Sequence, residues 1–278
     1  MPFANLNGYR LHYYDHDFAD PWTPHDAVLM HHGLGRSGAT WFAWVPHLSR
    51  HFRVLRVDAR GHGESPDPGP DNPWGLDQFV EDVRTLLDEL KLPRIHYVGD
   101  SLGGIIGIAF SAAHPDRVAS LTLVATPTHV SPLSQKAMAL GYEDMGEAAA
   151  TMGSRQWWLE LLKRTRQTHP DQPRRDQWLG DQTGKISPNV LKGLSKVLPG
   201  VNVSDRLPLI KAPTLILAPG ASRGTSSLEQ QTGMHQAIPN STMKVFEGQG
   251  IYLHSEFPDR CAQATLEFLL RLQPSKQP

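Results

Sequence analysis

The sequence predicts an α/β fold with a mostly parallel, doubly wound sheet, an antiparallel N-terminal edge and an inserted helical cap. Short apolar runs rich in β-branched residues recur along the chain, separated by turn residues and helical patterns. This rhythm stops after residue 126, helical patterns fill residues 127–207, and a strand-like run then follows. We therefore expect a core formed by residues 1–126 and 208–278, interrupted by a cap at residues 127–207.

The first two strands are expected to form a hairpin. Residues 3–6 and 10–14 flank Asn7-Gly8, a dipeptide suited to a tight turn between antiparallel strands. Residues 76–90 repeat apolar side chains on one helical face, which predicts a crossover helix. The runs expected to form parallel strands are residues 27–30, 52–58, 95–99, 120–125, 214–218 and 242–246.

The cap is expected to be helical because SRQWWLELLKRTR and SPNVLKGLSKVL, at residues 154–166 and 187–198, follow helical patterns. Trp157 and Trp158 are candidate substrate-binding residues in this cap. Packing of one layer of the protein on another is the alternative role for such aromatic side chains.

Composition narrows the kinds of partner. The 278 residues include 27 Lys and Arg against 28 Asp and Glu, so no global field would attract nucleic acid or an anionic membrane. A small-molecule substrate is expected instead, and a monomer or a homodimer fits equally well. The start of the chain lacks the pattern of a signal peptide, and no apolar run is long enough to span a bilayer, so we expect a soluble, cytoplasmic protein.

No cofactor or metal site is expected from the sequence. The 14 histidines show no recognisable ligand spacing with carboxylates or cysteine, and GDSLGG lacks the spacing of a dinucleotide-binding loop. The single cysteine, Cys261, excludes an internal disulfide and is interpreted as a buried thiol.

The strongest chemical motif is Gly99-Asp100-Ser101-Leu102-Gly103, which satisfies G-x-S-x-G. A strand is expected before it and a helix after it, the context in which such a serine occupies a strained turn and exposes its hydroxyl. Flanking glycines let the neighbouring backbone approach closely. Ser101 is therefore the candidate nucleophile, and a helix-start serine that acts only as a cap is the alternative.

A second motif, LMHHGLGRSGATW, follows the first parallel strand. In a doubly wound sheet this loop lies beside the nucleophile, so the backbone N–H groups of Leu34 and Leu102 are candidate donors to an oxyanion. Gly33 is a candidate substrate-binding residue in the same loop. His31 and His32 are interpreted as structural, and an ordinary glycine turn is the alternative for the whole motif.

The third motif, VDARGHGESPDP, supplies turn-forming residues after the next strand. We interpret Asp58 and His62 as loop architecture. They are not expected to act as a base and its orienting acid.

Together, MHHGLG, DARGHGES, GDSLGG and KAPTLILAPG resemble the α/β-hydrolase superfamily, in its subgroup of capped esterases, enol-lactonases and carbon–carbon bond hydrolases. The motifs occur in the order of that family over nearly the whole chain. The resemblance implies the α/β-hydrolase fold, Ser101 as nucleophile and an oxyanion hole at Leu34 and Leu102. It also implies an acidic residue in the loop after TLILA and a histidine after VFEGQG.

The chain departs from the family pattern at these last two positions. Gly248-Gln249-Gly250 is followed by Ile251 where the resemblance implies the catalytic histidine. The loop PGASRGTSS contains no carboxylate, and Ser222 lies close to where the acid is implied. The acid of a triad orients the histidine, so a chain that lacks the histidine does not need the acid. The two departures are therefore consistent with each other.

Three hypotheses follow from this gap. The base is relocated to His254, three residues after Ile251, or to His129, which is also a candidate substrate-binding residue; Glu247 or Glu229 would orient it. Alternatively, the protein is a lyase, cyclase, decarboxylase or isomerase that needs no ordinary triad. The third hypothesis is a ligand binder, or a variant in which Ile251 has replaced a native histidine. We favour a serine hydrolase acting on a small, largely apolar ester, lactone or carbon–carbon substrate.

Overall fold

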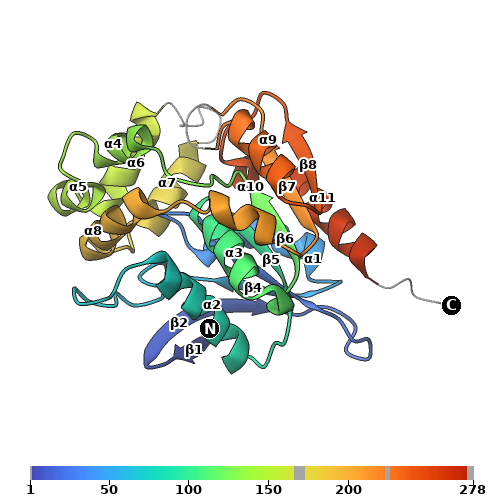
Figure 1. Cartoon of the computed structure of the whole chain (residues 1–278). Coiled ribbons are helices and arrows are strands. Elements are labelled where there is room, and N and C mark those ends of the chain that lie inside the picture. Colours follow the sequence, from blue (N-terminus) through green and yellow to red (C-terminus); the bar gives the residue numbers. More distant parts are fainter. Residues whose placement is uncertain (1, 166–172, 223–225, 274–278) are drawn as a thin grey trace.

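The computed structural model describes residues 2–165, 173–222 and 226–273. One eight-stranded sheet runs through the molecule in the order β1-β2-β4-β3-β5-β6-β7-β8, with helices on both faces (Figure 1). The strands are β1 (Phe3–Leu6), β2 (Tyr9–His16), β3 (Ala27–His31), β4 (Arg53–Val57), β5 (Ile95–Asp100), β6 (Val118–Val124), β7 (Thr214–Pro219) and β8 (Ser241–Phe246).

The N-terminal edge is antiparallel, as predicted. β1 and β2 pair with Leu6 opposite Tyr9, and β2 also runs antiparallel to β4. The turn between them places Asn7 at φ 53° and Gly8 at φ 95°. A tight hairpin turn needs this left-handed backbone, which asparagine and glycine tolerate better than other residues.

The remaining strands pair in parallel, from β4 through β3, β5, β6 and β7 to β8. Along β3, Leu29 packs into one apolar cluster, and Val28 and Met30 pack into the other, because successive side chains point to opposite faces. Both faces are covered, which explains the continuous apolar runs in the sequence. The predicted fold class is confirmed.

The helices of the core lie on either side of the sheet. The first cluster includes side chains of α2 and α3, and the second includes side chains of η1, α1 and α11. The crossover helix predicted at residues 76–90 is α2. The helices outside the group between α4 and η3 are η1 (Gly38–Trp44), α1 (Val45–Leu48), α2 (Leu76–Glu89), α3 (Leu102–Ala113), η2 (Pro115–Arg117), η4 (Ser204–Leu209), α9 (Leu228–Ala237), α10 (Leu253–Glu256) and α11 (Pro258–Leu272).

Between β6 and β7, helices group together at one side of the sheet (Figure 1). They are α4 (Pro132–Ala139), α5 (Met145–Met152), α6 (Ser154–Arg164), α7 (Pro173–Thr183), α8 (Pro188–Val197) and η3 (Leu198–Gly200). The two predicted helical stretches correspond to α6 and α8, although the end of the first, residue 166, lies outside the described residues. The division into core and cap at residues 127 and 207 stays a prediction.

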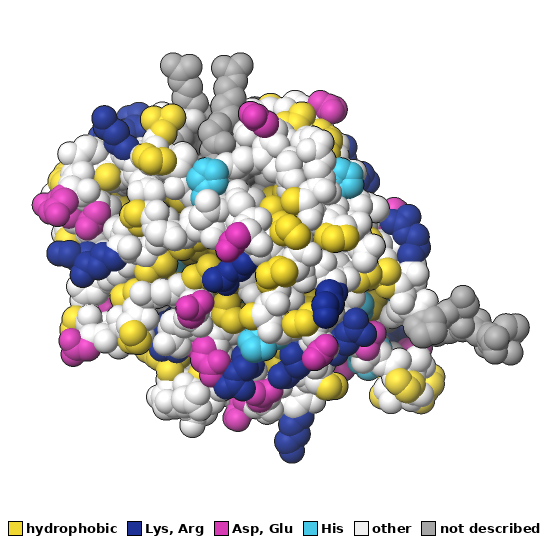
Figure 2. Space-filling model, viewed as in Figure 1, with side chains coloured by type: hydrophobic (Ala, Val, Ile, Leu, Met, Phe, Trp, Pro, Cys, Tyr) yellow, Lys and Arg dark blue, Asp and Glu magenta, His cyan; other side chains and the backbone are white. Residues whose placement is uncertain are grey.

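The surface carries charges of both signs. On the face shown in Figure 2, Lys and Arg side chains alternate with Asp and Glu side chains, and hydrophobic side chains lie between them. Within the described ranges, no helix is both long and apolar enough to cross a membrane.

Candidate active site

Ser101 lies between the end of β5 and the start of α3, in a backbone conformation that residues other than glycine rarely adopt. Its φ is 51° and its ψ is −115°. Such strain persists only where the surroundings enforce it. A Cβ on Gly99 would lie 2.5 Å from the carbonyl oxygen of Gly103, so the turn closes only because that side chain is absent. The turn leaves Ser101 partly exposed.

The loop after β3 lies directly against this turn. A Cβ on Gly33 would be 3.0 Å from the Cβ of Ser101 and 2.8 Å from Oδ2 of Asp100. Leu34, the next residue, is half-buried. Leu102 begins α3, so its N–H is among the first-turn donors that have no acceptor within the helix. The two residues named as oxyanion donors therefore flank Ser101 on separate elements, and their role stays a prediction.

Asp100 and Arg36 form a buried ion pair beside Ser101. Arg36 Nη1 donates to Asp100 Oδ2, and both side chains are at most 5% exposed. The guanidinium of Arg36 also lies over the ring of Tyr252, 4.8 Å from its centroid. Burial raises the pKa of Asp100, and the positive charge of Arg36 opposes that shift.

His254 faces this ion pair. Its Nδ1 lies 3.4 Å from Arg36 Nη1 and 3.5 Å from Asp100 Oδ1. Burial, together with the charges of Arg36 and Arg175, lowers its pKa well below the usual value, so the ring is neutral at pH 7. In the part of the chain that the structure describes, no hydrogen bond joins His254 to Ser101.

The carbonyl and ring of His254 are also fixed. Its backbone oxygen accepts a hydrogen bond of 2.9 Å from Nε1 of Trp44. Its ring lies 5.1 Å from that of Trp41, and its side chain is 1% exposed. Reorienting this imidazole toward Ser101 would require repacking around it, and its role as a relocated base stays a prediction.

The two loops that deliver the acid and the histidine in the resemblance lie side by side. Ala221 N donates to the carbonyl oxygen of Gln249 over 2.9 Å, and Gly220 N donates to that of Phe246. Ile251 is half-buried and packs against both apolar clusters. Ser222 is partly exposed, and residues 223–225 of its loop lie outside the described residues.

The candidate substrate-binding residues of the cap and of the loop after β6 lie in different environments. Trp157 is fully buried, and its indole N–H donates to Met138 O over 2.8 Å. Trp158 lies over the loop after β3, where a Cβ on Gly35 would be 2.8 Å from its ring. His129 is half-buried and pairs with Asn202 as an isolated bridge. Their contacts with a substrate stay predictions.

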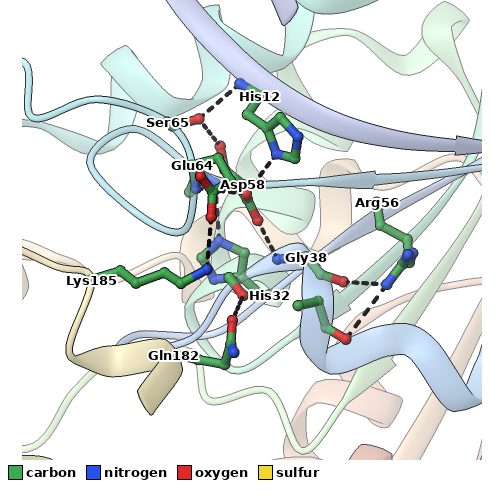
Figure 3. Close-up of polar contacts among 12 residues, drawn as sticks. His12, His32, Gly38, Arg56, Asp58, Glu64, Ser65, Gln182 and Lys185 are labelled. Carbon is green, nitrogen blue, oxygen red and sulfur yellow. Dashed lines mark hydrogen bonds and ion pairs between the residues drawn. The ribbon is translucent and has the colours of Figure 1, made fainter. Parts of the chain in front are cut away.

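Asp58 holds the loops around the site together (Figure 3). Its Oδ2 lies 2.7 Å from Nδ1 of His12 and accepts from Glu64 N, and its Oδ1 accepts from Gly38 N over 2.6 Å. His12 belongs to β2, Gly38 begins η1, and Glu64 lies in the loop after β4. The carboxylate is thus committed to backbone and imidazole donors, which is the arrangement of a structural residue.

His32 fixes the position of Gly33. Its Nδ1 lies 2.8 Å from the carbonyl oxygen of Gly33, and its Nε2 accepts from Ala59 N over 2.9 Å. Its ring lies 5.0 Å from that of His62, whose Nδ1 is 3.0 Å from Arg60 O. Both imidazoles therefore bond to backbone.

Sequence reasoning missed Arg36 and Asp100. Both stand inside motifs that were otherwise explained by glycines and by Ser101. A charged residue in a segment that is expected to be buried needs a partner of opposite charge. The presence of one positive and one negative residue in these two motifs could therefore have indicated the ion pair. Among the described residues, no group of three or more His, Cys, Asp or Glu side chains is placed to hold a metal ion.

Comparisons with known proteins agree on one family. A model of the alpha/beta hydrolase fold matches residues 26–258. The crystal structure of the enol-lactonase from Burkholderia xenovorans LB400 is similar with a TM-score of 0.85 and 26% identity, over 97% of this chain and 100% of that one. A hydrolase from Pseudomonas aeruginosa PA01 is 28% identical with a TM-score of 0.78, over 96% and 97% of the two chains.

Relatives from bacteria are provisionally named carbamate hydrolase RutD. The protein from Caulobacter sp. (strain K31) is 26% identical over 258 residues, which is 90% of this chain and 92% of that protein. The one from Caulobacter segnis is 35% identical over 104 residues, and this match spans 37% of this chain and 39% of that relative.

Proposed function

Because the chain belongs to the α/β-hydrolase family and is a hydrolase of that fold, we propose that it cleaves a small, largely apolar ester, lactone or carbon–carbon substrate with Ser101 as the nucleophile. The observation that carries the proposal is the strained turn at Ser101, with φ 51° and ψ −115°, packed against Gly33. A turn of this kind presents a hydroxyl at the carboxyl end of the parallel strands, where ligands bind in such sheets.

For an ester or lactone the chemistry is acyl transfer. Ser101 Oγ forms a bond to the carbonyl carbon, the carbonyl oxygen takes the negative charge, and the N–H groups of Leu34 and Leu102 hold it. The hydroxyl proton of Ser101 passes to the leaving oxygen as the bond between that oxygen and the carbonyl carbon breaks. Water then attacks the acyl-enzyme, its hydroxyl stays on the released acid, and its other proton restores the serine. Each such oxyanion donor is worth about 10²–10³ in turnover in other enzymes.

The site lacks an evident general base for Ser101 among the residues that the structure describes. His254 faces Asp100 and Arg36, and its lowered pKa makes it a poor proton acceptor. General-base assistance is typically worth about 10²–10⁴ in rate, so ester hydrolysis that relies on Ser101 and the oxyanion donors is expected to be slow. A substrate with a good leaving group needs this assistance least.

One observation favours a second function. The apolar residue Ile251 follows Gly250 in the loop after β8, where the resemblance implies the catalytic histidine. This loop contacts the loop after β7 through the hydrogen bond from Ala221 N to Gln249 O. Oxyanion donors without a strong base suit the stabilisation of an enolate or alkoxide, as in a lyase, decarboxylase or isomerase, or the binding of a ligand without turnover.

The test of the proposal is hydrolysis of p-nitrophenyl acetate and butyrate, with an aryl carbamate included because of the named relatives. Ser101→Ala should reduce turnover of every hydrolysed substrate to the uncatalysed rate. Ser195→Ala is the matched control, because Ser195 Oγ donates to Leu191 O within α8, and it should retain full activity. A fluorophosphonate probe should label Ser101, as read by mass spectrometry.

Wild-type rates in Ser101→Ala would reject the nucleophile. Covalent labelling of Ser101 without turnover of any of these esters would favour the second function, because the hydroxyl would then be reactive in a site that does not complete hydrolysis.

A further inference from the structure

We propose that the cleft between η1, α7 and α10 is a binding site for an aromatic carboxylate. The cleft has a volume of about 510 Å³ and is lined by Phe42 and Ala43 of η1, Arg174 and Trp178 of α7, and His254 of α10. Sites for small molecules typically have volumes of about 300–1,000 Å³. The inference does not rest on the proposed function, because Ser101 does not line this cleft.

The apolar part of the cleft is aromatic. The rings of Phe42 and Trp178 lie 5.7 Å apart at an interplanar angle of 75°, an edge-to-face pair. Phe42 is 62% exposed although it is a large hydrophobic side chain. A flat ligand ring would cover this surface and extend the edge-to-face packing, which favours aromatic over aliphatic ligands.

The cation available in the cleft is Arg174. Arg175 beside it is committed, because its Nη2 bonds to Asp176 over 3.0 Å and its Nη1 to Glu256 over 3.2 Å. Arg174 is exposed and makes no hydrogen bond or ion pair with any residue that the structure describes. A free guanidinium presents paired N–H donors that match a carboxylate.

The second polar group that faces the cleft is His254. Its side chain is 99% buried, and its Nε2 has no hydrogen-bond partner among the described residues. Nδ1 lies 3.4 Å from the donor Arg36 Nη1 and 3.5 Å from the acceptor Asp100 Oδ1, so its contacts fit either tautomer of the neutral ring. A buried ring nitrogen without a hydrogen-bond partner is costly, and a polar group of a ligand would satisfy it.

These groups define the ligand by its chemistry. Arg174 is a positively charged donor, so the complementary ligand presents acceptor oxygens and carries a negative charge. Phe42 and Trp178 select a flat ring next to that group. Phenylacetate is therefore the probe, and phenylacetamide, cyclohexylacetate and phenylethylamine differ from it in charge, in aromaticity and in the sign of the charge.

The experiment is titration calorimetry of the full chain with these four probes. Phenylacetate should bind saturably at millimolar or lower concentration, cyclohexylacetate more weakly, and phenylacetamide and phenylethylamine at least about tenfold more weakly. Arg174→Gln should weaken phenylacetate about tenfold and reduce the preference for it over phenylacetamide. Arg271→Gln is the matched control, because Arg271 is an exposed arginine on α11 outside the cleft, and it should leave the affinity unchanged.

His254 is tested without a substitution in the core. The ¹⁵N resonances of its ring should shift when phenylacetate is added, and not when phenylethylamine is added. No saturable binding of phenylacetate, equal affinity for phenylacetate and phenylacetamide, or an Arg174→Gln variant that binds like the wild type would each overturn the site. Because the readout is binding, these results are independent of whether Ser101 turns over an ester.

Discussion

At the scale of single residues, the site is organised by a buried charge pair. Asp100 is inaccessible to solvent and Arg36 nearly so, and their contact joins the loop after β3 to the turn that carries Ser101. His254 completes the cluster through both partners. Where the resemblance implies an imidazole that accepts the serine proton, the chain has Ile251, and the imidazole of His254 instead contacts Arg36 and Asp100.

Removal of Arg36 should therefore destabilise the fold strongly. Arg36→Leu leaves the carboxylate of Asp100 buried without its counter-charge, and breaking a buried pair in this way costs about 3–5 kcal/mol. Urea denaturation measures the loss. The double variant Arg36→Leu/Asp100→Asn should recover part of it, because no unpaired charge then remains.

The matched control is Arg53→Leu. Arg53 forms two hydrogen bonds with Asp15, but both side chains are almost 30% exposed, at 29% and 28%. An ion pair of this exposure is worth at most about 1 kcal/mol. Equal losses in Arg36→Leu and Arg53→Leu would contradict the central role of the buried pair.

At the scale of elements, the first turn of α3 packs directly against the backbone at the end of β3. A Cβ on Gly103 would lie 2.6 Å from the carbonyl oxygen of His32 and would also overlap that of His31. The helix thus touches the end of β3 directly. This contact places the first turn of α3 beside the loop that holds Gly33 and Leu34.

Gly103→Ala should consequently destabilise the protein in spite of the higher helix propensity of alanine. Forcing a methyl group into a packed site costs about 1–3 kcal/mol. Esterase activity should fall with it, because the turn at Ser101 must shift. Thermal unfolding and ester hydrolysis measure the two effects.

Gly233→Ala in α9 is the control for propensity alone. A Cβ there would meet no heavy atom within 4 Å. Alanine should stabilise this helix by about 0.5–1 kcal/mol. A stabilising effect of Gly103→Ala would show that the backbone contact with β3 is not as close as observed.

At the scale of the whole molecule, buried histidines lie in the centre of the fold. His31, His32 and His62 are each at most 4% exposed. Burial is the largest cause that lowers their pKa values, to about 4 for His31. They are neutral in the folded protein at pH 7 and bond to backbone, so the core holds imidazoles that resist protonation.

Stability should fall as the pH falls below the pKa of histidine in the unfolded chain, about 6.5. Between that value and about 4, the unfolded chain binds a proton that folded His31 does not, so the free energy of unfolding decreases. For His31 alone the decrease is about 1.5 kcal/mol between pH 6.5 and pH 5. Urea denaturation at these pH values measures it, and a stability unchanged over this window would contradict the prediction.

The sequence was sufficient for the features that local chemistry dictates. Asn7-Gly8 required the hairpin, continuous apolar runs required strands covered on both faces, and G-x-S-x-G between a strand and a helix marked Ser101, whose strained backbone the structure reproduces. It also showed that Ile251 stands where the resemblance implies a histidine. Each of these depends on residues close together in the chain.

Only the tertiary structure decided what His254 faces, that Arg36 pairs with Asp100, and that Trp157 is buried while Trp158 lies over Gly35. Arg36 and His254 are separated by 218 positions in the chain. Spacing could place His254 near Ile251, but the direction of a side chain depends on the packing around it, here Trp41 and the ion pair. Whether the imidazole of His254 contacts the serine or the arginine is therefore set by contacts between segments that are distant in the sequence.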